Sequence, residues 1–229
     1  LANDPEALSF YGNSDTFNEL DNSGISMQID HDFENFALTS ITSFRNVDSY
    51  SNIDADFTSA DIIQNDISTD IDTFSQEIRL ASTNGDKVDW MIGGYLFDES
   101  VDYTNNLPFG VGYRPYLDAI SFGGYSAVEG ILRLPFGTFG NANSGVTEVS
   151  TLENDAISLF GSLDFHISDR LTATIGLNYT KDEKEATTHQ TQRDLFSSVD
   201  FVQLGGALIA GGLIQQGVPA AQAAAIAAS

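Results

Sequence analysis

Hydrophobic and polar residues alternate along two neighbouring stretches, residues 155–168 and residues 171–180. The apolar positions of the first stretch are Ile157, Leu159, Gly161, Leu163, Phe165 and Ile167, and those of the second are Leu171, Ala173, Ile175, Leu177 and Tyr179. A period of two predicts β-strands that carry one apolar and one polar face. The turn at residues 168–170 joins them into a predicted hairpin.

The length of these two strands indicates a membrane protein. Soluble strands usually have about 5 to 6 residues, whereas a tilted strand needs about 9 to 11 residues to cross a bilayer. Each arm of the hairpin reaches the longer figure. The sequence contains no run of about 18 apolar residues, so we expect no transmembrane helix, and the pattern favours a membrane β-barrel.

Similar alternation predicts four further strands. We expect them at residues 24–31, 36–45, 72–82 and 88–99, with Asn84-Gly85 as a hairpin turn because this dipeptide favours type I′ turns. The segments expected to be loops are residues 1–23, 47–71, 100–154 and 186–229, the last with short helices around Pro219. Short and long connections therefore alternate, as in outer-membrane barrels, whose periplasmic turns are short and extracellular loops long.

The balance of charge limits the partners. The chain carries 33 acidic and 9 basic residues, which give a net charge of -24, and it has no cysteine. Nucleic-acid binding requires clustered Lys and Arg, so we expect no nucleic-acid partner. Cations or neutral molecules fit this charge better.

Three segments of the sequence resemble the barrel of TonB-dependent outer-membrane receptors. They are FSQEIRLAS (74–82) followed by VDWMIGGYLFDES (88–100), and FGSLDFHISDRLTATIGLNYTKDEKE (160–185). LTSITSFRN (38–46) is similar to a preceding strand of the same barrels, and Asn178 departs from the family, which often has Arg there. The resemblance implies an all-β fold: an antiparallel transmembrane β-barrel of about 22 strands, of which residues 1–229 hold six, with long extracellular loops.

The same resemblance implies a function in the outer membrane of a Gram-negative bacterium. Such a receptor takes up a scarce nutrient, and a ferric siderophore is the expected small-molecule ligand. Its partners would be outer-membrane lipid and the TonB energy-coupling complex, reached through a plug domain. The sequence shows neither the plug nor the closing strand and begins at Leu1 without a secretory signal, so we expect a fragment. Residues 205–229 are expected to be an Ala/Gly-rich extracellular loop segment.

Two groups of residues are candidates for functional roles. In the loop at 100–154, Tyr113, Arg114, Tyr116 and Arg133 are candidates for contact with a flat, partly anionic ligand, because aromatic rings and guanidinium groups bind such surfaces. The alternative is that these loop residues pack on each other. On the polar parity of the strands, Glu77, Arg79, Asp89 and Glu99 are candidates for a charge network in the lumen.

The sequence shows no pattern for catalysis. His31, His166 and His189 lack the spacing of a metal helix or a nucleophile relay, and no phosphate loop or nucleophile elbow occurs. We therefore expect no enzyme activity and no cofactor. The pairs Asp54-x-Asp56 and Asp70-x-Asp72 offer oxygen ligands for a hard cation, but no loop matches a Ca²⁺ template and a solvated acidic surface is favoured, so no metal site is expected.

Two other functions remain open from the sequence. A passive outer-membrane porin would share the strands and the loops but would lack a plug. A non-transport surface protein would use a β-sheet, such as a sandwich, as a binding module.

Overall fold

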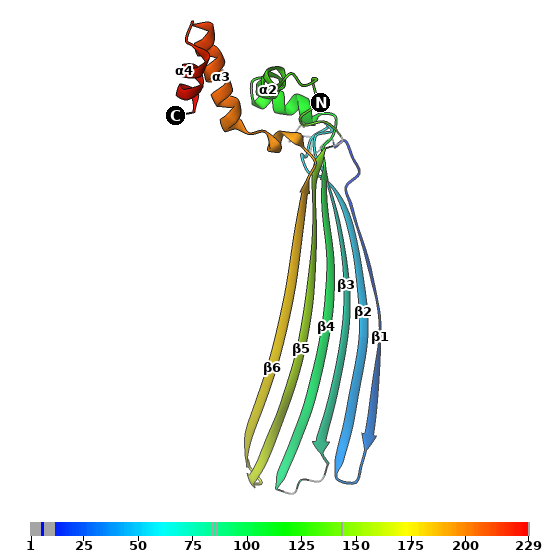
Figure 1. The fold of residues 1–229 in the computed structure, drawn as a ribbon. Coiled ribbons are helices and arrows are strands. Elements are labelled where there is room, and N and C mark those ends of the chain that lie inside the picture. The colour runs from blue at the N-terminus through cyan, green and yellow to red at the C-terminus, as the bar shows by residue number, and fades with distance from the viewer. Residues whose placement is uncertain (1–5, 7–11, 84, 86, 143, 229) are drawn as a thin grey trace. The chain divides into compact units, whose positions relative to one another are not determined.

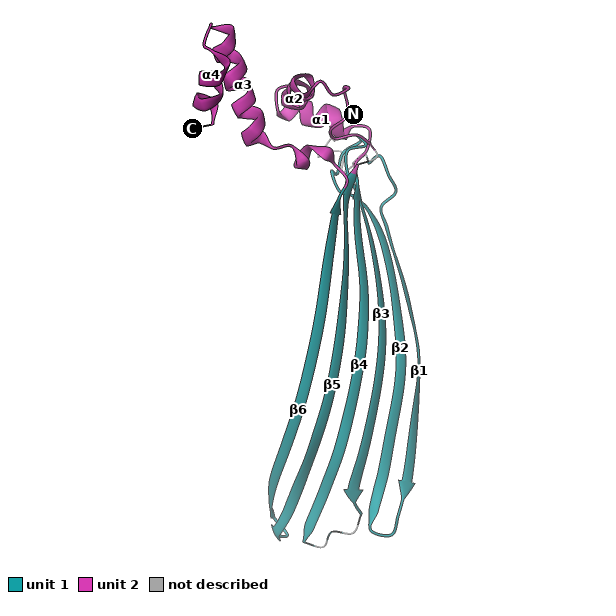
Figure 2. Cartoon of the chain, in the orientation of Figure 1, with its two compact units in different colours: residues 1–108, 145–192 teal, residues 109–144, 193–229 magenta. Residues whose placement is uncertain are grey.

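The computed structural model describes residues 6, 12–83, 85, 87–142 and 144–228. The chain divides into two compact units (Figure 2). A sheet unit comprises residues 1–108 and 145–192, and a helical unit comprises residues 109–144 and 193–229.

The sheet unit is one antiparallel sheet of six strands. They are β1 (Phe17–Asp32), β2 (Phe36–Asp54), β3 (Gln64–Ser82), β4 (Val88–Pro108), β5 (Gly145–Ser168) and β6 (Leu171–Gln192). The strands lie side by side in chain order, and each pairs with the next (Figure 1). The sheet has two open edges, at β1 and β6, as expected for part of a barrel. The six predicted strands and the predicted partial, antiparallel barrel are confirmed.

The predicted loops were too long. The strands extend into residues 17–23, 47–54, 64–71, 100–108, 145–154 and 186–192, which the sequence pattern had assigned to loops. The connections that remain are residues 33–35, 55–63, 83–87, 109–144 and 169–170, so short and long connections still alternate. The predicted Asn84-Gly85 turn lies partly outside the described residues.

One face of the sheet carries most of the apolar side chains that are exposed, including Ile78, Ile92, Leu159 and Ile175; we call it the belt face and the opposite face the inner face. Along the middle of β5, at residues 153–165, the belt-face residues other than Gly161 are exposed and the inner-face residues between them are half-buried. A curved sheet gives this alternation, because side chains spread apart on the convex side and crowd together on the concave side. The belt face is therefore convex, as expected for the lipid side of a barrel.

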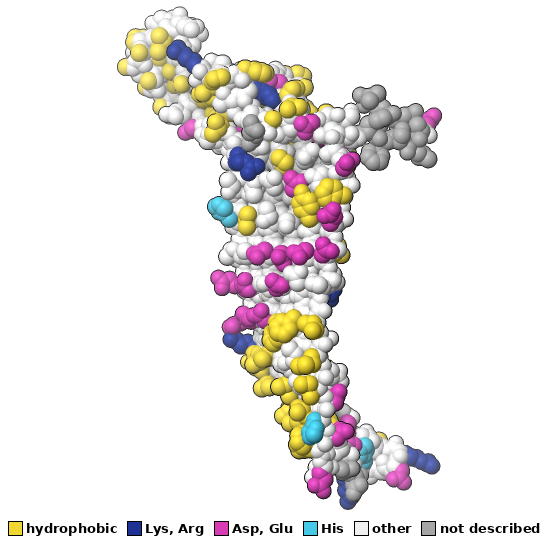
Figure 3. Space-filling model, turned by 90° about the vertical axis from the view of Figure 1, so that its right-hand side faces the viewer, with side chains coloured by type: hydrophobic (Ala, Val, Ile, Leu, Met, Phe, Trp, Pro, Cys, Tyr) yellow, Lys and Arg dark blue, Asp and Glu magenta, His cyan; other side chains and the backbone are white. Residues whose placement is uncertain are grey.

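The polarity of both faces changes toward the strand ends that lead to the long connections. On the belt face, Asp21 pairs with Asp48, Asp48 with Asp70, and Asp70 with Asp102, which forms one row across four strands. We call this row and its acidic neighbours (Asp72, Asp98, Glu153, Asp155, Glu183 and Glu185) the acidic rows. Figure 3 shows such bands of Asp and Glu above a field of hydrophobic side chains.

The inner face shows the reverse change at the same height. Val47, Ile71, Val101, Leu152 and Ala186 are successive partners in the register and form an apolar row across β2 to β6. Apolar and polar residues thus still alternate with a period of two, but here the apolar residues lie on the inner face and the polar residues on the belt face. This exchange, together with the abundance of Asp, Ser and Asn, which are typical of turns, explains why residues 47–54 and 64–71 resembled loops.

The helical unit contains α1 (Tyr113–Ile120), α2 (Gly124–Leu132), the short 3₁₀ helix η1 (Leu195–Ser198), α3 (Phe201–Gln215) and α4 (Ala220–Ala227). The Asp200 carboxylate caps α3 by accepting a hydrogen bond from the Gln203 backbone N–H at 2.9 Å, and Pro219 precedes α4. These last two helices match the short helices predicted around Pro219, whereas α1 and α2 were not predicted. No helix in the described part of the chain combines the length and the apolar character that a membrane crossing requires.

Candidate functional site

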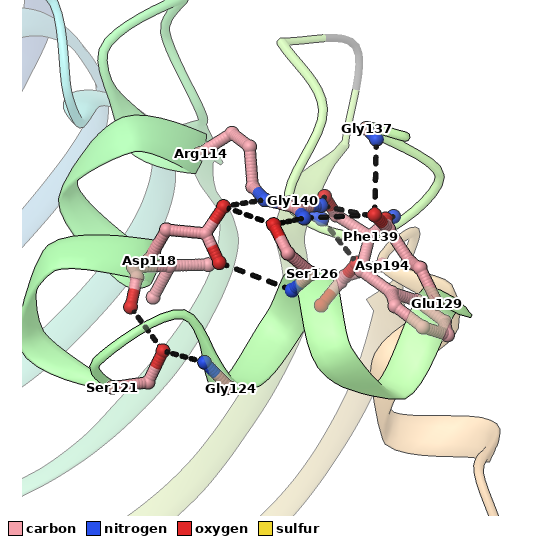
Figure 4. Close-up of polar contacts among 11 residues, drawn as sticks. Arg114, Asp118, Ser121, Gly124, Ser126, Glu129, Gly137, Phe139, Gly140 and Asp194 are labelled. Carbon is pink, nitrogen blue, oxygen red and sulfur yellow. Dashed lines mark hydrogen bonds and ion pairs between the residues drawn. The ribbon is translucent and has the colours of Figure 1, made fainter. Parts of the chain in front are cut away.

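A buried ion pair holds the first half of the helical unit together (Figure 4). Arg114 of α1 is 5% exposed and Glu129 of α2 is 2% exposed. The guanidinium donates two hydrogen bonds to the Glu129 carboxylate, from Nη1 at 2.6 Å and from Nη2 at 2.8 Å. It also donates from Nε to Asp118 at 2.9 Å and from Nη1 to the Phe139 carbonyl oxygen at 2.9 Å. The pair therefore has the bidentate geometry that is strongest for Arg and a carboxylate.

The carboxylates of this cluster have further donors. Glu129 accepts hydrogen bonds from the backbone N–H groups of Phe139 at 2.9 Å and Gly137 at 3.2 Å. The Arg114 hydrogen bonds, helped by these N–H groups, hold the pKa of Glu129 below its usual value against the opposing effect of burial. Burial also acts to raise the pKa of Asp118, but hydrogen bonds from Arg114 and Ser126 outweigh it and lower that pKa. Both groups are thus ionised at neutral pH.

The four loop candidates from the sequence have different surroundings. Arg114 is occupied by the contacts just described, and Tyr113 stacks on Phe109 with the ring centroids 3.8 Å apart. Burial raises the pKa of the Tyr113 hydroxyl. Tyr116 is 45% exposed and Arg133 is also exposed. Tyr116 and Arg133 are therefore accessible to a ligand, while Arg114 organises the unit; the ligand contacts themselves stay a prediction.

Two exposed aromatic residues of the helical unit were not singled out from the sequence. Phe122, in the turn between α1 and α2, is 98% exposed and has a φ of 52°, a left-handed conformation that is unfavourable for a bulky residue. Phe136 is 77% exposed, and its ring centroid lies 4.7 Å from Arg114 Cζ. The signal available for Phe122 was its place before Gly123 and Gly124, a pair that predicts a turn. Strained and exposed residues of this kind are often found at binding sites.

The four lumen candidates share the inner face but form no single network. Glu77 and Arg79 lie close together, with 2.8 Å between Oε1 and Nε, although the Nε–H itself has no hydrogen-bond partner. Asp89 instead contacts His166 Nε2 at 2.8 Å and accepts a hydrogen bond from Ser82 Oγ at 3.0 Å. Glu99 lies ten residues from Asp89 along β4, or about 33 Å at the usual rise of a strand. The structure therefore brings only Glu77 and Arg79 together.

The described residues contain no group of three or more His, Cys, Asp or Glu side chains arranged to hold a metal ion. The groups that the two units offer for contact are exposed rings and Arg133 in the helical unit, and polar groups with an apolar row on the inner face of the sheet.

Comparison with known proteins finds a matching family and solved structures of similar fold. A family model described as "TonB dependent receptor-like, beta-barrel" matches residues 2–206. The chain is similar in structure to the ferric yersiniabactin uptake receptor FyuA from Yersinia pestis, with a TM-score of 0.56 and 11% sequence identity. That similarity covers 78% of this chain and 23% of the receptor, so the chain spans about a quarter of the receptor's length. No curated protein sequence gives a match.

Proposed function

Because the chain belongs to the TonB-dependent receptor β-barrel family, we propose that the whole protein is an outer-membrane receptor of a Gram-negative bacterium that takes up a scarce nutrient. The single observation that carries the proposal is the family match, which spans all six strands of the sheet. The belt face would meet outer-membrane lipid, and energy would reach the receptor from the TonB complex through a plug domain.

A ferric siderophore is the ligand that we favour. Such ligands combine flat apolar surface with negative charge, and the helical unit exposes matching groups in Tyr116, Phe122, Phe136 and Arg133. Aromatic rings offer apolar area at a low cost in conformational entropy, and a guanidinium group binds anionic oxygens. The helical unit, including residues 205–229, would form extracellular loops that capture the ligand.

The inner face would line the lumen. The ion pair of Glu77 with Arg79, and the separate groups Asp89 and Glu99, would then contact the plug or the substrate path. The apolar row of Val47, Ile71, Val101, Leu152 and Ala186 would give the plug an apolar surface to pack against, at the height where the belt face becomes acidic.

Uptake by intact cells tests this function. A strain that lacks the gene for the full-length receptor should lose accumulation of its iron-loaded siderophore, and a plasmid copy should restore it. Deletion of TonB should abolish the restored uptake. Growth on ferric siderophores, vitamin B12 and glycans as separate sources would identify the ligand class.

The outcomes separate the two alternatives. A passive porin would give uptake that does not depend on TonB, and a surface binding protein would retain ligand on cells without importing it. Either result would contradict the proposed function.

A further inference from the structure

Among the described residues of the sheet unit, a buried Asp side chain has a carboxylate oxygen without a partner. Asp54, the last residue of β2, is 6% exposed, and its Oδ1 has no hydrogen-bond partner. Two more side-chain oxygens, Asn13 Oδ1 and Ser14 Oγ, are also buried and unpartnered. Burial of a polar oxygen without a partner costs free energy. A cation or a hydrogen-bond donor beside Asp54 Oδ1 would remove that cost.

The segment at residues 12–16 lies against Asp54. A Cβ added to Gly12 would be 3.1 Å from Asp54 Oδ2, and the Asp54 backbone N–H donates a hydrogen bond to Thr16 Oγ1 at 3.3 Å. Asn13 Nδ2 donates to Asp61 Oδ1 at 3.4 Å. The amide oxygen of the same side chain has no hydrogen-bond partner, so it remains available as a ligand. Oxygen atoms from two segments distant in sequence thus gather at one corner.

The neighbouring sequence supplies no positive charge for this corner. Residues 12–30 and 46–78 contain no Lys, Arg or His. Asp56 is already satisfied, because its carboxylate accepts hydrogen bonds from the backbone N–H groups of Thr58, Ile62 and Ile63. Together with a hydrogen bond from the Thr58 hydroxyl, these contacts outweigh burial and lower the pKa of Asp56. They also fix the connection at residues 55–63, beside which Asp54 Oδ1 has no hydrogen-bond partner.

We propose that this corner binds Ca²⁺, with Asp54 as the charged ligand and the Asn13 and Ser14 oxygens as neutral ligands. Ca²⁺ accepts six to eight oxygen ligands in flexible geometry, including amide oxygens and water, whereas Mg²⁺ demands a near-ideal octahedron. One carboxylate with neutral oxygens is a ligand set of low charge, so the expected dissociation constant is about 0.1 to 1 mM, as in extracellular modules. The ion would link residues 12–16 to the end of β2. This site departs from the sequence expectation of no metal, and it does not depend on which nutrient is transported.

Calcium binding to the purified full-length receptor tests the site. The protein, stripped of metal with EDTA in detergent, is titrated with Ca²⁺ by calorimetry, while hydrogen exchange is followed at residues 12–16 and 55–63. We expect saturable binding and slower exchange in both segments. Asp54→Asn, which keeps the side-chain shape but removes the charge, should weaken binding by about tenfold or more.

Two further variants make the test specific. Asp102→Asn removes the same charge from an exposed position in the acidic rows and should bind Ca²⁺ as the unmodified protein does. Asn13→Asp adds a charged ligand and should tighten binding, a gain that misfolding cannot produce. The proposal is overturned if the unmodified protein shows no saturable binding up to about 10 mM, well above the expected range. Equal affinity in Asp54→Asn, or an equal loss in Asp102→Asn, would also overturn it.

Discussion

In the helical unit the charged Arg114 and Glu129 are 5% and 2% exposed, whereas in the sheet unit the apolar Leu159 and Leu177 are 61% and 81% exposed. The helical unit builds its own interior around an ion pair. The sheet unit is held by the hydrogen bonds between its strands and leaves its apolar side chains exposed, on the face that the proposed function assigns to the bilayer. A buried charge is therefore accommodated in one unit because it is paired, and an unpaired charge would destabilise the other unit where that unit faces lipid.

The largest effect is expected from breaking the ion pair. Arg114→Met leaves the Glu129 carboxylate buried without its main partner, and such a loss typically costs about 3 to 5 kcal/mol. Local hydrogen exchange in α1 and α2 of the full-length receptor would measure it. The double variant Arg114→Met with Glu129→Leu should recover part of this loss, because it also removes the buried Glu129 carboxylate, while Asp118 keeps its hydrogen bonds from Ser126. If both variants lose the same stability, the ion pair is not the cause.

A charge placed on the belt face should have the next largest effect. Ile175 is 59% exposed on that face, and Ile175→Arg should destabilise the receptor in lipid by about 2 to 4 kcal/mol, the cost of Arg near the bilayer midplane. Thr174→Arg is the matched control, because Thr174 lies on the inner face next to Asp164. Unfolding in liposomes by denaturant would measure both. Equal costs at the two positions would show that the belt face does not meet lipid.

A smaller effect is expected where the inner face is tightly packed. The Phe160 ring covers Gly93, so a Cβ at this position would lie 2.6 Å from Phe160 Cε2 and 3.0 Å from the Ile78 carbonyl oxygen. Gly93→Ala should cost about 1 to 3 kcal/mol. Gly94→Ala, on the belt face, would make only an ordinary contact at 3.5 Å with Leu159 and should be almost neutral. The same unfolding experiment would compare the two, and reversed effects would mean that the faces are assigned the wrong way round.

The smallest effect on stability is expected at the exposed Phe122. Phe122→Gly removes the strain of a left-handed bulky residue and should stabilise the helical unit by about 1 kcal/mol. Phe122→Ala keeps most of that strain. Both variants remove the ring, so both should weaken binding of the transported ligand to a similar degree, which a binding titration would show. Unchanged affinity in both would remove Phe122 from the ligand contacts.

The alternation along residues 155–180 was sufficient to predict the β5–β6 hairpin, its two faces and, with its length, a membrane barrel. Six strands and the order of short and long connections followed from the same pattern, because a period of two is a local property of the backbone. The resemblance to one receptor family could also be recognised from the sequence, because each of the three segments that carry it is a short continuous stretch.

Only the tertiary structure decided the remaining features, since each depends on partners that are distant in sequence. Residues 47–54 and 64–71 become strands because they pair with each other, although their composition is typical of loops. Arg114 becomes a buried structural residue because Glu129, fifteen positions later, folds against it. The burial of Asp54 likewise depends on residues 12–16, about forty positions away, because a side chain's desolvation is set by whatever the fold places around it.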